Sequence, residues 1–199
     1  TDLKPQPADP GQNIVTTLDL DIQHDVENLM KNKKGVILVG TAKSGEILAA
    51  VSSPDFRPDL FTGRMSENEW QNVLFHPEKP LINRFNQGLY PPGSIVKMIT
   101  QSRLLQNQNF NPNEVYKCEG NYQFGDRLFG CWREKGHGDM NLSSAIINSC
   151  DIYFYKTINY YDLDMLSESF RMFGFGNITN VDILNESNGI VPSSRFMNQ

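Results

Sequence analysis

The stretch Tyr90-Pro91-Pro92-Gly93-Ser94-Ile95-Val96-Lys97 marks a change from loop to helix. Two prolines and a glycine disfavour regular structure before Ser94. The apolar residues that follow, over residues 98–105, recur at helical spacing. We therefore expect Ser94 at the N-terminus of a helix, with Lys97 one turn further along the same face. Cβ atoms at this spacing lie about 5–6 Å apart.

A serine and a lysine arranged in this way can act as a nucleophile and its base. A serine hydroxyl attacks poorly unless a neighbouring base takes its proton. A lysine can be that base when burial or nearby positive charge lowers its pKa. The helix N-terminus adds positive potential and N–H groups that can bind an oxyanion. A Ser-x-x-Lys pair alone also fits an ordinary surface serine and lysine, so other motifs must support the assignment.

The amino-acid composition is typical of a soluble globular domain. The chain has 199 residues, of which 39% are hydrophobic and 21% charged. A net charge of −5 argues against binding to nucleic acid, which normally requires a basic face. No apolar run approaches the roughly 18–20 residues needed to cross a bilayer. We expect an extended, proline-containing lead-in over residues 1–12 and a single domain over residues 13–199.

Hydrophobic periodicity predicts most of the remaining elements. Residues 35–40 and 46–51 are predicted to form a β-hairpin. Both strands are apolar on successive residues, so we expect helices on both faces of the sheet. A capping box, Ser66-Glu67-Asn68-Glu69, predicts a short helix after it. Residues 107–141 show no clear period and are expected to be irregular. The other predictions are a strand at 13–18, a helix at 19–30, hairpin strands at 35–40 and 46–51, helices at 142–161 and 162–173, and a strand with a turn at 178–189.

A second motif, Ser149-Cys150-Asp151, falls inside the helix predicted for residues 142–161. Together with the Ser94 motif it makes the chain resemble the transpeptidase domain of class B penicillin-binding proteins of the elongation type, penicillin-binding protein 2. Further stretches carry the resemblance along nearly the whole chain. They are Gly45-Glu46-Ile47-Leu48-Ala49, Val51-Ser52-Ser53-Pro54, Leu60-Phe61-Thr62-Gly63, Asn83-Arg84, Gly136-His137-Gly138, Ser149-Cys150-Asp151-Ile152-Tyr153-Phe154-Tyr155 and Phe173-Gly174-Phe175-Gly176.

The resemblance implies an α/β (α+β) fold, that of the penicillin-recognising serine transpeptidases and β-lactamases, in which helices flank an antiparallel sheet. It implies that Ser94 attacks the D-Ala-D-Ala carbonyl of a peptidoglycan stem peptide and forms an acyl-enzyme, with Lys97 as the base. Ser149 would relay a proton between Lys97 and the leaving amine. Asp151 stands where the family pattern has Asn. A carboxylate there could hold Lys97 in its charged form.

The resemblance also implies a biological setting. The parent protein would cross-link the cell wall during elongation, be acylated by β-lactams, and work with a membrane glycosyltransferase, without a cofactor for catalysis. The domain would lie in the periplasm, below an anchor in the inner membrane that is not part of this chain. The family's third motif, Lys-Thr-Gly, does not occur in the sequence. We therefore expect a chain truncated before its C-terminal strands that by itself acylates slowly or not at all.

Three cysteines and a histidine form a candidate metal site. The set Cys118, Cys131, His137 and Cys150 includes every cysteine of the chain and one of its three histidines. Three thiolates and an imidazole complete a tetrahedral zinc site with no open position, so we predict a structural Zn²⁺. The resemblance favours zinc, because elongation-type relatives have a similar arrangement of cysteines and histidine. The alternative is a Cys118–Cys131 disulfide with Cys150 buried and free.

Two other functions remain open at this point. A β-lactamase or β-lactam sensor shares the Ser-x-x-Lys motif, and rapid deacylation of a penicillin adduct would favour it. Residues 60–63 and 136–138 argue against that reading, because they belong to the transpeptidase resemblance. The second alternative is a non-catalytic binding module braced by zinc, which would form no covalent adduct with penicillin.

Overall fold

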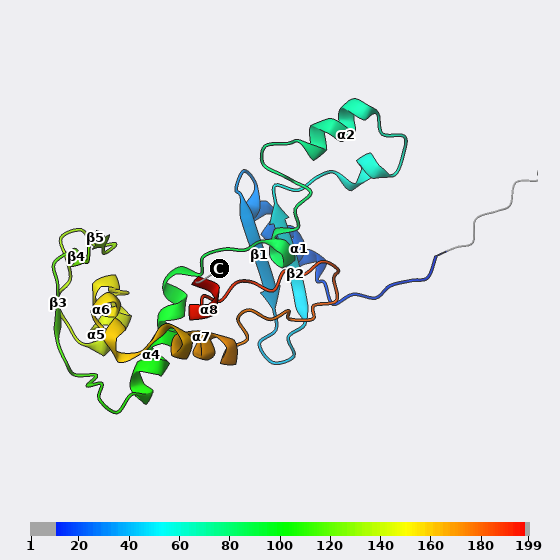
Figure 1. Cartoon of the computed structure of the whole chain (residues 1–199). Coiled ribbons are helices and arrows are strands. Elements are labelled where there is room, and N and C mark those ends of the chain that lie inside the picture. Colours follow the sequence, from blue (N-terminus) through cyan, green and yellow to red (C-terminus); the bar gives the residue numbers. More distant parts are fainter. Residues whose placement is uncertain (1–10, 198–199) are drawn as a thin grey trace, which may run out of the picture. The chain divides into compact units, whose positions relative to one another are not determined.

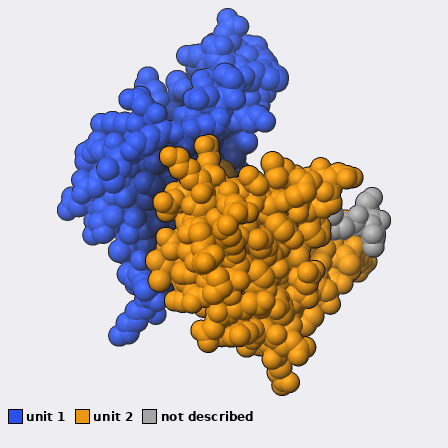
Figure 2. All heavy atoms as spheres, turned by 90° about the vertical axis from the view of Figure 1, so that its left-hand side faces the viewer, with its two compact units in different colours: residues 1–88 blue, residues 89–199 orange. Residues whose placement is uncertain are grey.

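The computed structural model describes residues 11–197 (Figure 1). The chain divides into two compact units, with the boundary between Gly88 and Leu89 (Figure 2). Most of the lead-in predicted for residues 1–12 lies outside the described residues. Residues 11 and 12 are irregular and exposed.

The first unit is built on a helix and a hairpin. Helix α1 (Leu20–Met30) begins at Asp19, whose carboxylate accepts hydrogen bonds from the N–H groups of residues 21 and 22. Strands β1 (Gly35–Gly40) and β2 (Ile47–Ser53) pair in antiparallel fashion. Helix α1 lies against this hairpin (Figure 1), and the buried core between them comprises Val26, Met30, Ala49 and Val51. The predicted helix and hairpin are confirmed.

The opposite face of the hairpin is only partly covered. Side chains alternate between the faces of a strand, so Ile37 and Val39 face the α1 core while Leu38 points away from it. The short helix α3 (Arg84–Gln87) contacts both strands. Leu38 nevertheless remains 52% exposed. The prediction that helices cover both faces is wrong here, because a helix of four residues covers only part of the second face.

Residues 13–18 do not form the predicted strand. The end of this segment runs beside β2, where the Thr17 hydroxyl donates to the Ile47 carbonyl at 2.6 Å and the Asp19 N–H donates to the Leu48 carbonyl at 2.8 Å. Ile14 and Val15 are 86% and 96% exposed. β-branched residues favour a strand only where they pack on neighbours, and these two do not.

The connection from β2 to α3 carries two short helical segments, η1 (Pro58–Phe61) and α2 (Glu67–Leu74). The capping box predicted at Ser66 and Glu69 is present, with both reciprocal hydrogen bonds. Arg84 fixes the two ends of this connection. Its buried guanidinium donates to the backbone carbonyls of Pro54 and Lys79, each at 3.3 Å, and of Ile82 at 3.4 Å, and also to the Glu78 carbonyl.

The second unit begins with the predicted loop-to-helix change. A 3₁₀ turn η2 (Gly93–Val96) leads directly into helix α4 (Lys97–Gln106), which packs against α7 (Leu163–Met172). Residues 107–141, expected to be irregular, contain two small antiparallel pairs. These are β3 (Tyr116–Cys118) with β6 (Gly138–Met140), and β4 (Asn121–Phe124) with β5 (Arg127–Gly130). Strands of three or four residues are too short to show a hydrophobic period.

The single helix predicted for residues 142–161 is broken. It consists of α5 (Leu142–Ile147), α6 (Asp151–Lys156) and the 3₁₀ turn η3 (Ile158–Tyr160). Ser149 interrupts it with φ +49°, a left-handed conformation that a right-handed helix cannot contain. The motif Ser149-Cys150-Asp151 thus lies at a turn between two helices, not inside one. The core of this unit comprises Leu104, Phe110, Cys118, Cys131, Met140, Leu142, Ala145, Cys150, Ile152, Tyr153 and Phe154.

The C-terminal part contains one confirmed and one wrong prediction. Helix α7 starts after Asp162, which caps it, and ends before Gly174 at φ +87°, as predicted. Residues 178–189 are irregular, with a bend at 182–185 and no strand; the Glu186 carboxylate accepts hydrogen bonds from the N–H and the hydroxyl of Thr179. A last short helix, α8 (Ser194–Met197), follows. Among the described residues, no helix is long and apolar enough to cross a bilayer.

We predict that Arg84→Lys lowers the free energy of unfolding by about 2–4 kcal/mol, because the ammonium of a buried lysine cannot reproduce the planar fork that reaches four backbone carbonyls. Urea unfolding measures the loss. The matched control is Arg57→Lys, since Arg57 makes an exposed ion pair with Asp59 and the substitution should leave the midpoint unchanged. Equal midpoints for both variants would show that Arg84 does not secure this connection.

Candidate active site and metal site

Ser94 stands at the exposed start of the α4 region, as the sequence predicted. It lies in the turn η2, and its backbone carbonyl accepts the N–H of Lys97. In a 3₁₀ turn, residues three apart lie one above the other. Gly93 precedes it with φ +61°, a conformation that glycine adopts without steric cost. The structure therefore keeps the serine and the lysine on one face.

The Lys97 amine reaches from α4 to the turn between α5 and α6. Its Nζ donates to the Ser149 carbonyl at 2.8 Å and to the Ser149 hydroxyl at 3.0 Å. It also forms an ion pair with Asp151 Oδ1 at 2.6 Å. The amine lies 5.6 Å from the centre of the Phe154 ring. The two side chains of the ion pair are only 13% and 23% exposed, so solvent screens the pair less than it would a surface pair.

Trp132 completes this group, and its place beside Cys131 was the only feature of the sequence that could have pointed to it. Its backbone N–H donates to Asp151 Oδ2 at 3.2 Å. Its indole Nε1–H donates to the Asn148 carbonyl at 3.0 Å. The two oxygens of Asp151 are thus divided between Lys97 and Trp132. The tryptophan side chain itself is 64% exposed.

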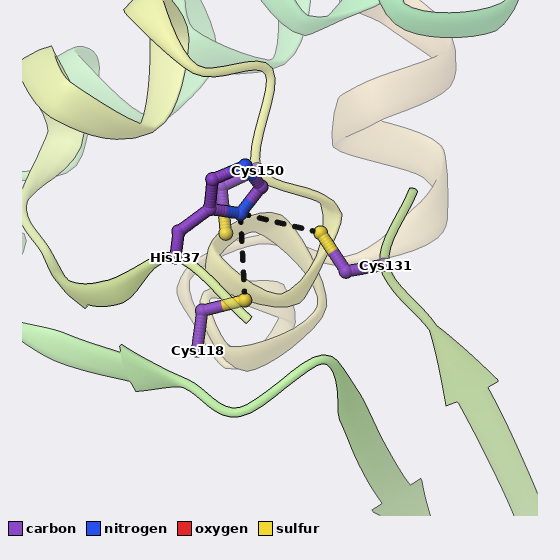
Figure 3. A group of neighbouring side chains, drawn as sticks. All are labelled: Cys118, Cys131, His137 and Cys150. Carbon is purple, nitrogen blue, oxygen red and sulfur yellow. Dashed lines mark hydrogen bonds between the residues drawn. The ribbon is translucent and has the colours of Figure 1, made fainter. Parts of the chain in front are cut away.

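The four predicted metal ligands converge beside the same turn (Figure 3). Cys118 ends β3, Cys131 follows β5, and Cys150 precedes α6. Their ligand atoms and a ring nitrogen of His137 all lie within 4.8 Å of one another. His137 Nδ1 is 3.6 Å from the Cys118 sulfur and 3.5 Å from the Cys131 sulfur. All three cysteines are buried and free, so the alternative Cys118–Cys131 disulfide is not formed.

Protonation in this cluster responds to burial and to neighbouring groups. Burial raises the pKa of the Cys150 thiol to about 12, and the neighbouring thiols Cys118 and Cys131 contribute to the rise. Burial also acts on Cys118, but hydrogen bonds from the backbone N–H groups of Gly120 and His137 outweigh it and lower its pKa. Burial, followed by the Arg133 cation, lowers the pKa of His137. This favours the neutral imidazole that metal coordination requires.

Two glycines allow the strands around the cluster to approach closely. A Cβ on Gly120 would lie 1.8 Å from the Glu134 carbonyl oxygen, and one on Gly136 would lie 2.2 Å from the Cys118 carbonyl oxygen. Both obstacles are backbone atoms and cannot rotate away. The Gly136-His137-Gly138 stretch thus contains one glycine that the packing requires, beside a ligand residue.

Comparisons with known proteins identify the family of the chain. The family model "Penicillin binding protein transpeptidase domain" matches residues 35–199. The peptidoglycan D,D-transpeptidase MrdA of Escherichia coli K12 is 32% identical over 196 residues, which cover 98% of this chain and 31% of MrdA. The chain therefore spans about a third of the length of the curated relatives it matches.

Solved structures are similar as well. The penicillin-binding protein PBP2 of Helicobacter pylori, in a complex with MreC, superposes with a TM-score of 0.84 at 39% identity over 92% of this chain and 35% of that chain. PBP2 of Pseudomonas aeruginosa in complex with WCK 5153 gives a TM-score of 0.83 at 32% identity over 95% of this chain and 43% of that chain. These findings confirm the predicted transpeptidase fold.

We predict unequal effects of alanine at the two glycines that flank His137. Gly136 and Gly138 both have φ +76°, so alanine is strained at either position, at a cost of about 1–2 kcal/mol. A Cβ at Gly138 meets no atom within 4 Å, whereas one at Gly136 meets backbone. Gly136→Ala should therefore cost about 1–3 kcal/mol more than Gly138→Ala in urea unfolding. Equal losses would contradict the close approach at Gly136.

Proposed function

The chain belongs to the penicillin-binding protein transpeptidase family, and we propose that it carries the acylating centre of a peptidoglycan D,D-transpeptidase of the elongation type. In this proposal Ser94 attacks the D-Ala-D-Ala carbonyl of a stem peptide. The alanine amine leaves and the peptide stays on the serine as an ester. The observation that carries the proposal is the Lys97 amine, which joins the Ser94 helix to the second motif through Ser149 and Asp151.

The proton leaves the nucleophile through Lys97. Ser94 loses its proton as its oxygen bonds to the carbonyl carbon, and Lys97, one turn away, accepts it. The Ser149 hydroxyl, 3.0 Å from Lys97 Nζ, then gives its proton to the leaving amine and takes the proton that Lys97 received from Ser94. No step requires a metal or an organic cofactor.

Asp151 sets the starting state of this path. An ammonium group has three N–H donors, and Lys97 contacts three acceptors: the Ser149 carbonyl, the Ser149 hydroxyl and Asp151 Oδ1. Lys97 must lose one of these protons before it can take the proton of Ser94. Asp151, in direct contact at 2.6 Å, is the counter-ion of this amine. The carboxylate thus stands where the family pattern has an amide, and it holds the lysine side chain against the second motif.

The remaining parts of the proposal concern the setting of the whole protein. We propose that it acts in the periplasm as part of an enzyme anchored in the inner membrane, that β-lactams acylate Ser94, and that a membrane glycosyltransferase is its partner. The penicillin-binding protein A of M. tuberculosis, 26% identical with a TM-score of 0.76 over 90% of this chain and 45% of that chain, has been solved as an imipenem acyl-enzyme complex, which supports the ligand class. The complex of the H. pylori relative with MreC supports a place in a multiprotein assembly.

The decisive test uses the whole protein to which this chain belongs. Its intact mass is measured after incubation with benzylpenicillin. We expect a stable adduct of one penicillin that is lost completely in Ser94→Ala. The matched control is Ser102→Ala on α4, which should acylate normally. An adduct that persists in Ser94→Ala would rule out this nucleophile, and rapid release of the adduct would identify a β-lactamase instead.

We further propose that Cys118, Cys131, His137 and Cys150 hold a structural Zn²⁺. In a tetrahedral site with Zn–S bonds of about 2.3 Å and a Zn–N bond of about 2.0 Å, nitrogen and sulfur ligands lie about 3.5 Å apart. The two measured separations from His137 Nδ1 are 3.5 and 3.6 Å. Four protein ligands leave no open position for water or substrate, so the metal would fix the fold and take no part in acyl transfer.

We predict that His137→Ala loses its zinc and melts at a temperature lower by roughly 5 °C or more, because metal binding contributes to folding stability. Metal content and thermal unfolding, with and without a chelator, are the measurements. His24→Ala, on the exposed side of α1, is the control and should retain the metal. A wild-type protein that contains no zinc, or a melting temperature that chelation leaves unchanged, would refute the site.

A further inference from the structure

Ser149 has a conformation that its own chemistry does not favour. Its φ of +49° is left-handed, and a serine at that angle is strained. Such a residue persists only where surrounding contacts fix it, and strained residues gather at functional sites. The contacts that fix Ser149 therefore determine where its hydroxyl points.

Two side chains hold the peptide groups on either side of Ser149. The Asn148 carbonyl belongs to the peptide group before the Ser149 Cα, and the indole N–H of Trp132 donates to it at 3.0 Å. The Ser149 carbonyl belongs to the peptide group after it, and Lys97 Nζ donates to it at 2.8 Å. The φ and ψ angles of Ser149 are rotations between these two peptide planes. The backbone restrains the same two planes, because the Ser149 N–H donates to the Ile146 carbonyl at 3.1 Å and the Cys150 N–H donates to the Ala145 carbonyl at 2.9 Å. The two side chains add to these local bonds and connect the turn to distant parts of the chain.

The same two residues also divide the carboxylate that follows. Lys97 binds Asp151 Oδ1, and the Trp132 backbone N–H binds Oδ2. Trp132 and Lys97 thus make the same kinds of contact: each donates to one backbone carbonyl of the turn and to one oxygen of Asp151. Unlike Lys97, it has no titratable group and no proton to transfer. Its contribution is to geometry.

We propose that Trp132 is a positioning residue for acyl transfer. Its indole N–H holds the turn that aims the Ser149 hydroxyl at Lys97. This inference rests on the proposed function, because positioning matters only if Ser149 relays a proton. The rest of the tryptophan side chain has different surroundings: its ring meets the His137 ring edge-on at 5.2 Å and is otherwise largely exposed.

The effect on rate should exceed the effect on stability. The Asn148 carbonyl can bond to water once the indole N–H is gone, so little folding stability is lost. A small displacement of a proton-relay group, in contrast, slows a reaction strongly. The test is replacement of Trp132 by 3-benzothienylalanine, which keeps the size and shape of the ring and substitutes sulfur for the N–H. Trp132→Phe is a second variant that also lacks the donor.

We expect the acylation rate constant for benzylpenicillin to fall about 10-fold in both variants. The dissociation constant of the non-covalent complex, zinc content and melting temperature should stay at their wild-type values. The backbone ¹³C shifts of Ser149 should move away from those of the left-handed conformation. The chain has one other tryptophan, Trp70 on α2, and the same replacement there should change none of these quantities.

The outcomes separate this inference from the proposed function. A wild-type rate in both Trp132 variants would overturn the positioning role and leave the role of Ser94 intact. Weaker non-covalent binding with an unchanged rate constant would overturn it too, and assign the ring to substrate contact. Slow acylation together with loss of zinc or a lower melting temperature would assign the effect to folding and also overturn it. If wild-type protein forms no adduct at Ser94, the proposed function falls, and this inference with it.

Discussion

The Lys97 amine is the contact on which the proposed centre depends. It joins the start of α4 to a turn more than fifty residues further along the chain, through Ser149 and Asp151. All three of its donors are directed at that turn, so its direction is fixed by three acceptors. Because the ion pair is largely buried, loss of either partner leaves a charge without a counter-ion, which costs more than the loss of a surface pair.

The break between α5 and α6 makes this contact possible. In a continuous helix the Ser149 carbonyl would accept the N–H four residues later and would point along the helix axis. The left-handed residue ends α5 and frees that carbonyl. It also turns the chain so that Cys150, the next residue, faces the cysteine–histidine cluster while its two neighbours face Lys97. One strained residue therefore serves two sites.

Local patterns in the sequence predicted the elements that depend on local chemistry. The Pro-Pro-Gly lead-in placed Ser94 before a helix, the capping box placed α2, and cysteine counting identified four residues that the structure brings together. The break at Ser149 escaped prediction, because hydrophobic periodicity reports which face of a helix is buried and continues across one interrupted turn. Backbone bonds at the end of α5 close around Ser149, and contacts from Lys97 and Trp132, which are distant in sequence, hold the same turn. The strand predicted for residues 13–18 is wrong for a related reason: β-branched residues favour a strand only where a partner strand is available, and local sequence does not show whether one is.

The proposed metal site and the proposed active site are adjacent for a physical reason. Residues 107–141 contribute only strands of three or four residues, and isolated hairpins of that size are marginally stable. Cys131 lies in this segment and directly precedes Trp132, which holds Asp151. A metal shared by Cys131 and Cys150 would connect the segment 107–141 to the start of α6. Cys131 is next to Trp132 in the chain, and Cys150 lies between Ser149 and Asp151, so the metal would hold the chain beside each of these residues. The position of Trp132 would then depend on the metal–ligand bonds, because the short hairpins alone are too weakly stable to fix it.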